Sequence, residues 1–430
     1  MVVFSHVFNL AKPKLAWLLF VSKGLSFMTH FNVPKYSVRI AAATLAMLAS
    51  ATALSACSNS EDTSASTGST GAAGDTAVTI TDVAGREVTF DKQPERIVLG
   101  EGRGLFATSI LNREDPLANI VAVGKDLHQA APSFESKFAE TNAAYKDLPT
   151  IGNIAKGDVT VENLLAQKPD VVVMTLDHKK AAEKSGFLDK MDQAGLKYVF
   201  TDFRQKPLEN TPKSMEVFGQ LLGREDKAAE FNKFYTGKVD DIKSRAEKAG
   251  DKPRTLVWRA AGLKDCCSTV KDSNLGDLVN AAGGENLGDS LLDTESGDLT
   301  AEKVLAEQPE HIIATGGAWA KDPEKPEVLP HVEMGYAAKE EKAQETLEGL
   351  LKTPGFDQLE APKEGNFHAV YHQFYDSPFN VFALEQFAVW MHPETFKDLD
   401  PEKDFADFHD KWLPIDYSGV FFTTKDAHKH

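Results

Sequence analysis

Cysteine is nearly absent from this sequence, whose 430 residues contain only Cys57, Cys266 and Cys267. So few thiols exclude a framework of several disulfides. Because Cys266 and Cys267 are adjacent, a disulfide between them would close a small strained ring, and two packed thiols are an equally open interpretation. One adjacent pair is also too little to predict a metal site.

The sequence also lacks the common catalytic signatures, with no HExxH, GxSxG or P-loop. Residues 288–291 read GDSL, like an esterase signature, but they lie late, follow a helical pattern, and no Asp-x-x-His comes after them. Residues 100–104 read GEGRG, which has the wrong spacing for a dinucleotide loop and predicts a tight turn. We therefore expect a binding protein and not an enzyme, with a surface hydrolase as the less favoured alternative.

Acidic residues are absent from the first 56 positions, which contain five basic residues, whereas the whole chain has a formal charge of −17. Without that segment the charge becomes −17 − 5 = −22. Nucleic-acid binding needs basic patches, so a chain this acidic is not expected to bind nucleic acid.

A secretory signal is predicted at the N-terminus. Residues 40–54 form an apolar, Ala-rich run that follows Lys35 and Arg39, and small residues precede Cys57. This order is typical of a signal peptide, and the run is too short for a good membrane span. The segment before Met28 is unusual for a signal, so translation could start at Met28.

The residues LSAC at 54–57 resemble a bacterial lipobox. The resemblance implies cleavage before Cys57 and acylation of its thiol, with palmitate among the acyl groups. A plain signal peptide with a chance cysteine is the alternative. The lipobox predicts a protein anchored to the cell membrane on its extracytoplasmic face.

Residues 58–76 contain no Val, Ile, Leu or aromatic residue and are expected to form a flexible tether that spans roughly 25 Å. The predicted organisation is a signal peptide at 1–56, the lipidated cysteine and tether at 57–76, an N-terminal lobe at 77–209, a helical linker region at 210–250, a C-terminal lobe at 251–425 and a tail at 426–430 with His428 and His430.

Short apolar runs that alternate with helical patterns follow this tether. Residues 77–90 alternate apolar and polar residues around 84–86 and predict a hairpin. The predicted strands are 96–100, 119–124, 170–175, 197–201, 255–259, 311–315 and 367–371. Continuous β-branched runs separated by helices favour an α/β fold with mainly parallel central sheets.

One long helix is predicted between the two sets of strands. Residues 225–249 are rich in Lys, Glu and Ala, carry apolar residues at helical spacing, and end before Gly250 and Pro253. Two Rossmann-like lobes joined by one long α-helix are the predicted architecture.

An internal similarity supports two related lobes. Residues 159–175 (VTVENLLAQKPDVVVMT) and 299–315 (LTAEKVLAEQPEHIIAT) share identical residues at six of 17 positions, at a constant offset of 140. Each segment reads as a Thr-capped helix, a Pro turn and a buried strand.

Six segments between residues 78 and 417 resemble the periplasmic-binding family that serves iron-siderophore, haem and cobalamin importers. They are DVAGREVTF, PERIVLG, VENLLAQKPDVVV, LVNAAGGENL, AEKVLAEQPEHIIA and FYDSPFNVFALEQFAVWMHPETFKDLDP. The resemblance implies two α/β lobes bridged by a helix, a ligand cleft between them, and delivery of the ligand to an ABC permease and its ATPase.

The resemblance also implies that one acidic residue on each lobe docks onto basic residues of the permease. Glu162 and Glu302, at equivalent places in the repeated segment, match those positions. The alternative is that each glutamate only offsets the positive end of its helix dipole.

Ligands of open α/β sheets bind beyond the carboxyl ends of the strands. The residues found there are Arg103, Arg204, Arg259, Trp319, His372 and Tyr375. Guanidinium groups suit an anionic ligand, and the aromatic rings can stack on a planar one. We therefore predict a ferric siderophore or a similar anionic iron chelate as the ligand.

Other ligands remain open. His372 and Tyr375 could ligate iron directly, although a packed or hydrogen-bonded histidine is favoured. Haem is the second candidate, followed by cobalamin or a free transition metal, whereas the long His-rich loop that would suit zinc is absent. A monomer without a resident cofactor or a metal held by the protein is expected.

Overall fold

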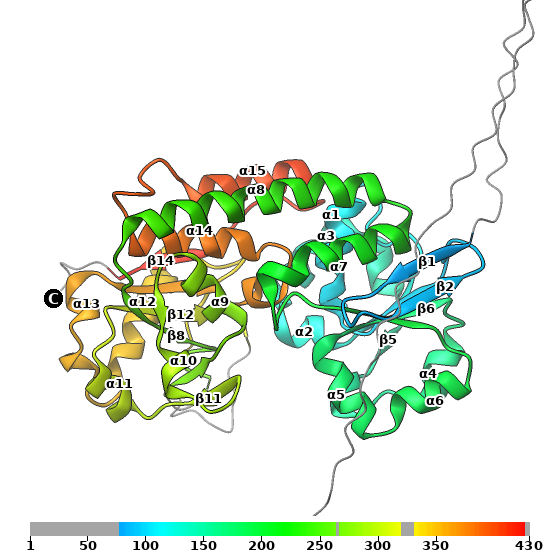
Figure 1. Cartoon of the computed structure of the whole chain (residues 1–430), viewed down its shortest axis with the longest axis horizontal. Coiled ribbons are helices and arrows are strands. Elements are labelled where there is room, and N and C mark those ends of the chain that lie inside the picture. The colour runs from blue at the N-terminus through cyan, green and yellow to red at the C-terminus, as the bar shows by residue number, and fades with distance from the viewer. Residues whose placement is uncertain (1–76, 264–265, 320–330, 426–430) are drawn as a thin grey trace, which may run out of the picture. The chain divides into compact units, whose positions relative to one another are not determined.

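The computed structural model describes residues 77–263, 266–319 and 331–425 (Figure 1). The predicted signal peptide, the start at Met28, the lipidation of Cys57, the tether and the tail with His428 and His430 lie outside the described residues. Within the described ranges, no helix combines the length and apolar character that a membrane crossing requires.

The predicted hairpin is confirmed as strands β1 (Val78–Thr81) and β2 (Glu87–Phe90), which pair antiparallel. The Asp82 carboxylate accepts hydrogen bonds from the backbone N–H of Arg86 at 2.9 Å and of Phe200 at 3.1 Å. These bonds close the turn and attach the hairpin to the neighbouring sheet.

The first lobe is built on a parallel sheet with the strand order β5-β4-β3-β6-β7. Its strands are β3 (Ile97–Leu99), β4 (Ile120–Gly124), β5 (Thr150–Ile151), β6 (Val171–Thr175) and β7 (Tyr198–Thr201). Its helices are α1 (Leu105–Leu111), α2 (Asp126–Ala130), α3 (Pro132–Thr141), α4 (Val161–Ala166), α5 (Leu176–Lys184) and α6 (Phe187–Gln193), with 3-10 turns η1 (Gly102–Gly104), η2 (Ala143–Asp147) and η3 (Ile154–Lys156).

The second lobe is built on the sheet β10-β8-β12-β13-β14, in which only the β13–β14 pair is antiparallel. Its strands are β8 (Arg254–Trp258), β10 (Glu285–Asn286), β12 (His311–Gly316), β13 (Phe367–Tyr371) and β14 (Phe422–Thr424), and β9 (Ser268–Val270) pairs with β11 (Ser296–Asp298) beside them. Its helices are α9 (Asn274–Ala281), α10 (Leu287–Leu291), α11 (Ala301–Glu307), α12 (Glu340–Gly349), α13 (Ala361–Glu364), α14 (Asn380–Met391) and α15 (Pro401–Trp412), with 3-10 turns η4 (Leu350–Lys352), η5 (Phe356–Gln358) and η6 (His372–Asp376).

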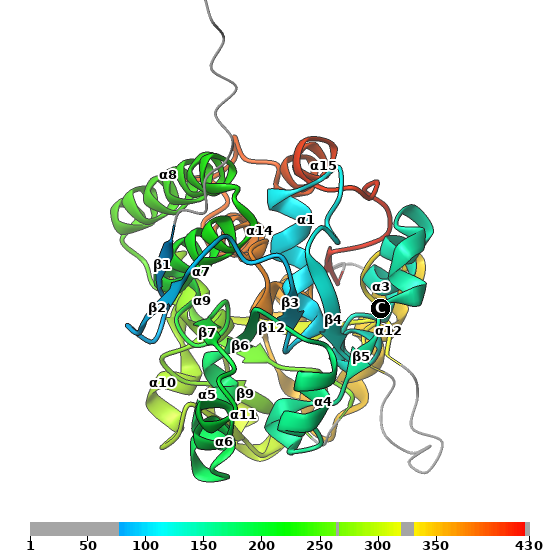
Figure 2. The ribbon, with the colours of Figure 1, turned by 90° about the vertical axis from the view of Figure 1, so that its right-hand side faces the viewer.

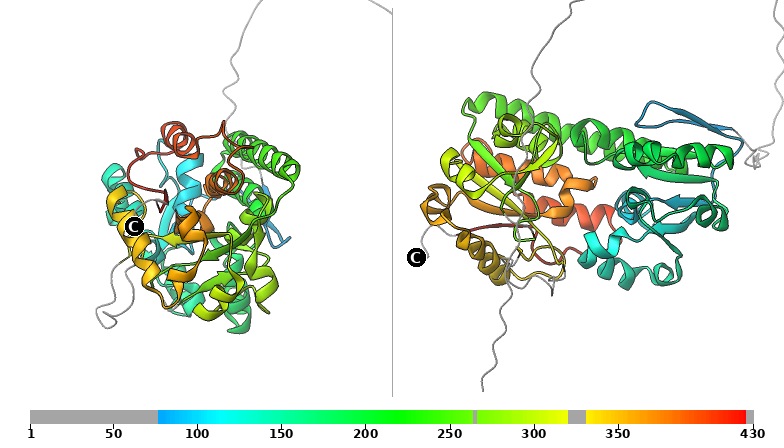
Figure 3. Two further views of the ribbon diagram at one scale, coloured as in Figure 1. Left: turned by 90° about the vertical axis from the view of Figure 1, so that its left-hand side faces the viewer. Right: turned by 90° about the horizontal axis from the view of Figure 1, so that it is seen from below.

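Helix α8 (Glu225–Ala249) connects the two lobes, as predicted, after α7 (Pro207–Leu222). Its 25 residues extend over about 37 Å at a rise of 1.5 Å each. It packs on α7 and on α14 and lies along one side of both lobes in Figures 1 and 2. The chain also crosses back, because α15 reaches the first lobe and contacts α1 (Figure 3).

The repeated segments form the same substructure in both lobes. Thr160 caps α4 by accepting a hydrogen bond from the Asn163 N–H at 3.2 Å, and Thr300 caps α11 through the Lys303 N–H at 3.2 Å. Strands β6 and β12 follow these helices and are buried. The α/β fold class with two parallel-sheet lobes is confirmed, while the domain boundaries stay predictions.

Candidate functional site

A pocket of about 690 Å³ lies between the two lobes. The first lobe contributes the end of α2 and the start of α3, and the second lobe contributes residues that follow β8, β12 and β13. The lining residues are His128, Gln129, Ala130, Pro132, Ala260, Leu263, Ala318, Trp319, His372, Gln373 and Tyr375. The pocket therefore occupies the carboxyl ends of second-lobe strands, where ligands of parallel sheets bind.

An aromatic wall with one imidazole borders this pocket. The ring centroids of Trp319 and His372 are 5.0 Å apart, and those of His372 and Tyr375 are 4.5 Å apart. His372 Nδ1 shares a 2.7 Å hydrogen bond with Thr315 Oγ1. Burial, followed by Arg259, lowers the pKa of His372 well below its usual value, so the imidazole is neutral.

Two side chains of the second lobe hold the edge of the pocket against the first lobe. The Ala130 carbonyl oxygen, at the end of α2, accepts hydrogen bonds from Trp319 Nε1 at 3.1 Å and from Gln373 Nε2 at 2.6 Å. These bonds fix the indole of Trp319 and join the two walls of the pocket.

Arg103 lies beside the pocket in a buried cluster of charges. Its Nε donates to Asp126 at 2.9 Å, its Nη2 to Glu101 at 3.1 Å and its Nη1 to Asp376 at 2.6 Å. Nη1 also donates to the hydroxyl of Tyr375. Only two residues separate β3 from η1, which carries Arg103, and its guanidinium contacts Asp376 and Tyr375 of the second lobe.

Arg204 follows β7 and joins the same cluster. Its Nη1 donates to Asp177, and its Nη2 donates to Asp376 and to Glu101, the latter at 3.3 Å. Its guanidinium lies 5.2 Å from the centroid of the Tyr375 ring. The structure thus brings Arg103, Arg204 and Tyr375 together.

Electrostatics in this cluster follow from burial and from the excess of carboxylates. Burial would raise the pKa of Glu101, but Arg103 and Arg204 hold it well below its usual range. Burial raises the pKa of Asp376 despite the same two arginines. Burial would lower the pKa of Arg103, yet Asp376 and Glu101 raise it, so the guanidinium stays charged.

Arg259 differs from the other two arginines. It follows β8, and its Nε is buried without a hydrogen-bond partner among the described residues. Burial lowers the pKa of Arg259, and the nearby Arg204 lowers it further. Within the described part of the chain, Arg259 makes no ion pair, so its charge is available to a ligand beside Ala260 and His372.

Glu162 and Glu302 lie in the first turns of α4 and α11, with exposed side chains. The pKa of each carboxyl is lowered, first by its own backbone N–H and then by the hydroxyl of the capping threonine. Figures 1 and 2 place α4 and α11 on the side of the described unit opposite α8. Neither glutamate is among the residues that line the pocket.

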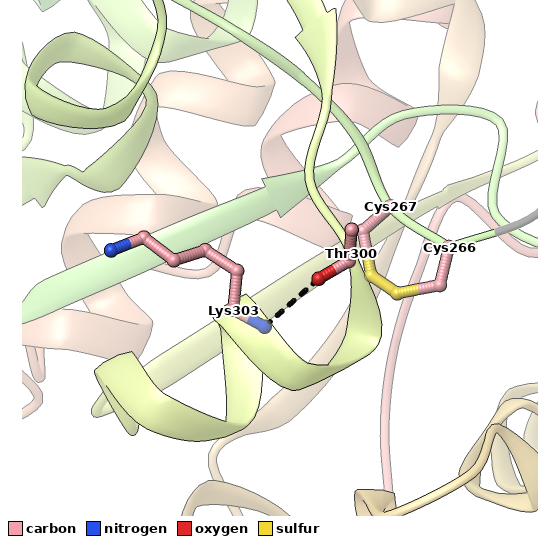
Figure 4. The surroundings of a disulfide bond; sticks show 4 residues. All are labelled: Cys266, Cys267, Thr300 and Lys303. Atoms are coloured by element: carbon pink, nitrogen blue, oxygen red, sulfur yellow. Dashed lines mark hydrogen bonds between the residues drawn. A yellow bond between two sulfur atoms is a disulfide. The ribbon is translucent and has the colours of Figure 1, made fainter.

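The structure joins Cys266 and Cys267 by a disulfide (Figure 4). The Cys267 backbone pairs with that of Leu299, next to the Thr300–Lys303 cap of α11. The pair therefore lies between the segment that carries Leu263 and the start of α11.

Sequence reasoning missed the carboxylates of the cluster. Glu101 stands inside the GEGRG turn and Asp376 directly follows Tyr375, so their positions next to predicted site residues were the available signal.

In the GEGRG turn, a side chain on Gly102 would lie 2.6 Å from the Gly124 carbonyl oxygen, which explains the glycine. In the GDSL segment, Asp289 accepts hydrogen bonds from Asn280 and Asn286, a structural role.

Potential metal ligands do not gather in the part of the chain that the structure describes, where no group of three or more His, Cys, Asp or Glu side chains could hold an ion.

Two sheet-centred lobes, a connecting helix and an interlobe pocket define a bilobal solute-binding protein.

Comparisons with known proteins agree with this class. The family described as periplasmic binding protein matches residues 123–371, more than half of the chain, so the chain belongs to this family. It is a substrate-binding protein of the ABC-transporter type.

Individual relatives support this assignment. The TroA-like periplasmic binding protein FepB of Veillonella parvula is 30% identical, with a TM-score of 0.72 over 81% of this chain and 100% of that chain. An uncharacterized ABC transporter substrate-binding lipoprotein, YvrC of Bacillus subtilis, is 24% identical over 58% of this chain and 72% of its own length. The molybdate-binding MolA of Haemophilus influenzae shares the fold, with 16% identity and a TM-score of 0.59 over 79% of this chain and 99% of that chain.

Proposed function

We propose that this protein is the extracytoplasmic binding lipoprotein of an ABC importer and that it delivers a ferric siderophore, or a similar anionic iron chelate, to a permease and its ATPase. The observation that carries the proposal is the interlobe pocket of about 690 Å³ with an aromatic wall, next to Arg259, which makes no ion pair among the described residues. A pocket of this size accepts a chelate the size of a drug molecule or larger.

The chemistry of the pocket supports a chelate more than a bare metal ion. Trp319 and Tyr375 offer ring faces and Gln373 and Gln129 offer amides, while Arg259 lies next in the chain to the lining residue Ala260. A bare ion needs several ligating side chains at short range. A ferric chelate brings its own oxygen ligands and presents their carbon framework and residual charge to the protein.

The absorption spectrum of the protein purified from its native host tests the ligand class. A broad visible charge-transfer band supports a ferric siderophore. A Soret band would instead identify haem, the second candidate, and a cobalamin spectrum the third. A colourless protein that contains stoichiometric zinc or manganese would contradict the chelate.

Titration with ferric siderophores separates binding from catalysis. Because Trp319 lines the pocket, saturable quenching of Trp fluorescence is expected, and Trp319→Phe should remove most of it. Release of a cleaved product during the titration would favour the surface-hydrolase alternative.

The proposal includes a lipid anchor at Cys57, supported by the LSAC sequence and by the similarity to the Bacillus subtilis lipoprotein YvrC. Replacement of Cys57 by Ser should move the protein from the membrane fraction to the soluble extracytoplasmic fraction. Retention of Cys57→Ser in the membrane fraction would contradict an anchor at this residue.

Delivery to the permease is assigned to Glu162 and Glu302. Both side chains are exposed, acidic and equivalent in the two lobes, which suits a partner with two basic sites. We propose that the protein acts as a monomer in this complex.

A further inference from the structure

We propose that Asp376 is a positioning residue that also sets the charge selectivity of the cleft, by joining the two lobes and compensating the positive charge of Arg103 and Arg204. This inference rests on the proposed function, because it concerns which iron chelates the same cleft accepts.

The contacts of Asp376 cross from one lobe to the other. Asp376 ends η6 in the second lobe, and its Oδ2 accepts from Arg103 Nη1 at 2.6 Å and from Arg204 Nη2. Both arginines belong to the first lobe, and Asp376 is only 3% exposed. One buried carboxylate oxygen therefore ties two first-lobe strand ends to the second lobe.

The same contacts fix the pocket wall. The 3-10 turn η6 carries His372, Gln373 and Tyr375, which line the pocket, and Asp376 is its last residue. Arg103 also donates to the Tyr375 hydroxyl. Tyr375 is therefore held at its hydroxyl by Arg103 and through the chain by the neighbouring Asp376. Such a side chain keeps its orientation when a ligand enters.

Charge compensation is the second consequence. Two guanidinium groups meet four carboxylates in this cluster, so Arg103 and Arg204 present little net positive charge to the pocket. The carboxylates are Glu101, Asp126, Asp177 and Asp376. Arg259 remains as the cation without an ion pair among the described residues. Within the proposed class of iron chelates, the cleft should therefore bind those with little net negative charge more tightly than strongly anionic ones.

The test compares three hexadentate ferric chelates, namely neutral ferrichrome, cationic ferrioxamine B and strongly anionic ferric enterobactin. Dissociation constants are measured by Trp fluorescence for the native protein, Asp376→Asn, Asp376→Glu and Asp410→Asn. Asp410→Asn is the matched control, because it removes the same charge from the exposed face of α15.

Asp376→Asn is expected to raise the ratio of enterobactin affinity to ferrichrome affinity by about tenfold, since it removes one negative charge from the buried cluster beside the pocket. Asp376→Glu keeps the charge and should leave this ratio close to that of the native protein, as should Asp410→Asn. A loss of packing alone would weaken all three chelates alike and leave the ratio unchanged, which would overturn the inference.

Glu101→Gln provides a second route if Asp376→Asn does not fold. This variant removes a first-lobe carboxylate that pairs with the same two arginines. The ratio of enterobactin affinity to ferrichrome affinity should therefore rise, as for Asp376→Asn. An unchanged ratio in this variant overturns the inference. If the native protein binds none of the three chelates, the proposed iron-chelate function fails, and the selectivity inference fails with it.

Discussion

Arg103, Arg204 and Arg259 are not among the residues that line the interlobe pocket, and their surroundings divide their roles. Arg103 and Arg204 pair with carboxylates, whereas Arg259 makes no ion pair among the described residues. A buried unpaired cation costs free energy of folding, and a ligand anion would recover it. The charge of Arg259 is therefore expected to raise the affinity for an anionic ligand and to lower the stability of the ligand-free protein.

Replacement of Arg259 by Gln should weaken binding of an anionic chelate by at least tenfold, because a charge-assisted hydrogen bond contributes about 1.5–3 kcal/mol. The melting temperature of the free protein should stay the same or rise, since the unpaired charge is removed. Fluorescence titration and thermal unfolding measure the two effects.

Arg254→Gln is the matched control for this variant. Arg254 lies at the other end of β8 and pairs with Glu307 at 2.5 Å, away from the pocket. It should leave ligand affinity unchanged. Equal loss of affinity in both variants would show that Arg259 does not contact the ligand.

A buried pair of histidines predicts acid sensitivity. His311 Nδ1 and His368 Nε2 share a hydrogen bond of 3.2 Å. Burial lowers the pKa of His311 to about 4 and also lowers the pKa of His368 well below its usual value. In the unfolded chain both titrate near the ordinary value of about 6.5. As the pH falls from about 6.5 to 4, the unfolded state takes up protons first, so stability is lost.

The free energy of unfolding should therefore drop as the pH is lowered from 7.5 to 4.5, with His311 alone contributing up to about 3 kcal/mol. Urea denaturation at a series of pH values measures this slope. His311→Gln should flatten it, whereas His128→Gln should not, because the His128 side chain is 82% exposed. Identical slopes in both variants would assign the acid sensitivity to other groups.

At the scale of elements, helix α8 contains an interior glycine that lowers its stability. Gly237 lies in the helix interior, is exposed, and has open space where a side chain would stand. Gly237→Ala should raise the free energy of unfolding by about 0.5–1 kcal/mol. Gly250→Ala, at the end of the same helix with a φ of +86°, should lower it, because alanine is strained there. Chemical denaturation of both variants checks the opposite signs.

Helices α4 and α11 are predicted to act as a pair in docking. Replacement of both Glu162 and Glu302 by Ala should abolish uptake into cells and leave the ligand dissociation constant nearly unchanged, because neither residue lines the pocket. Transport assays and fluorescence titration separate the two properties.

A double replacement in α8 controls for lost surface charge. Glu225 and Asp226 are the acidic residues in its first turn, on the opposite side of the described unit. Their replacement by Ala should leave uptake intact. Lost ligand binding in the Glu162/Glu302 variant would contradict the docking role.

At the scale of the whole described unit, the two lobes are joined at many points. Besides α8, the Ala130 carbonyl accepts from Trp319 and Gln373, Asn380 donates to Thr211 at 3.0 Å, and α15 packs on α1. Domain closure would break several of these bonds at once. Ligand binding should therefore change the radius of gyration by less than about 1 Å in solution scattering. A larger contraction would show that the lobes hinge.

Long buried strands and the long helix were predictable, whereas the short edge strands were not. Strands β6, β12 and β13 and helix α8 follow from apolar runs and from 3.6-residue periodicity. β5 and β10 have two residues each, and β14 pairs antiparallel at the sheet edge. Such short segments carry no periodicity, and only their neighbours in space make them strands.

The sequence by itself determined the two α/β lobes, the helix between them and the strand ends at which charged and aromatic residues gather, because these depend on local patterns of hydrophobicity. Only the tertiary structure decided which charges meet. Asp376 follows Arg103 by more than 270 positions, yet the two side chains are 2.6 Å apart. Charge compensation acts through space in a buried, weakly screened environment, so spacing along the chain cannot reveal it.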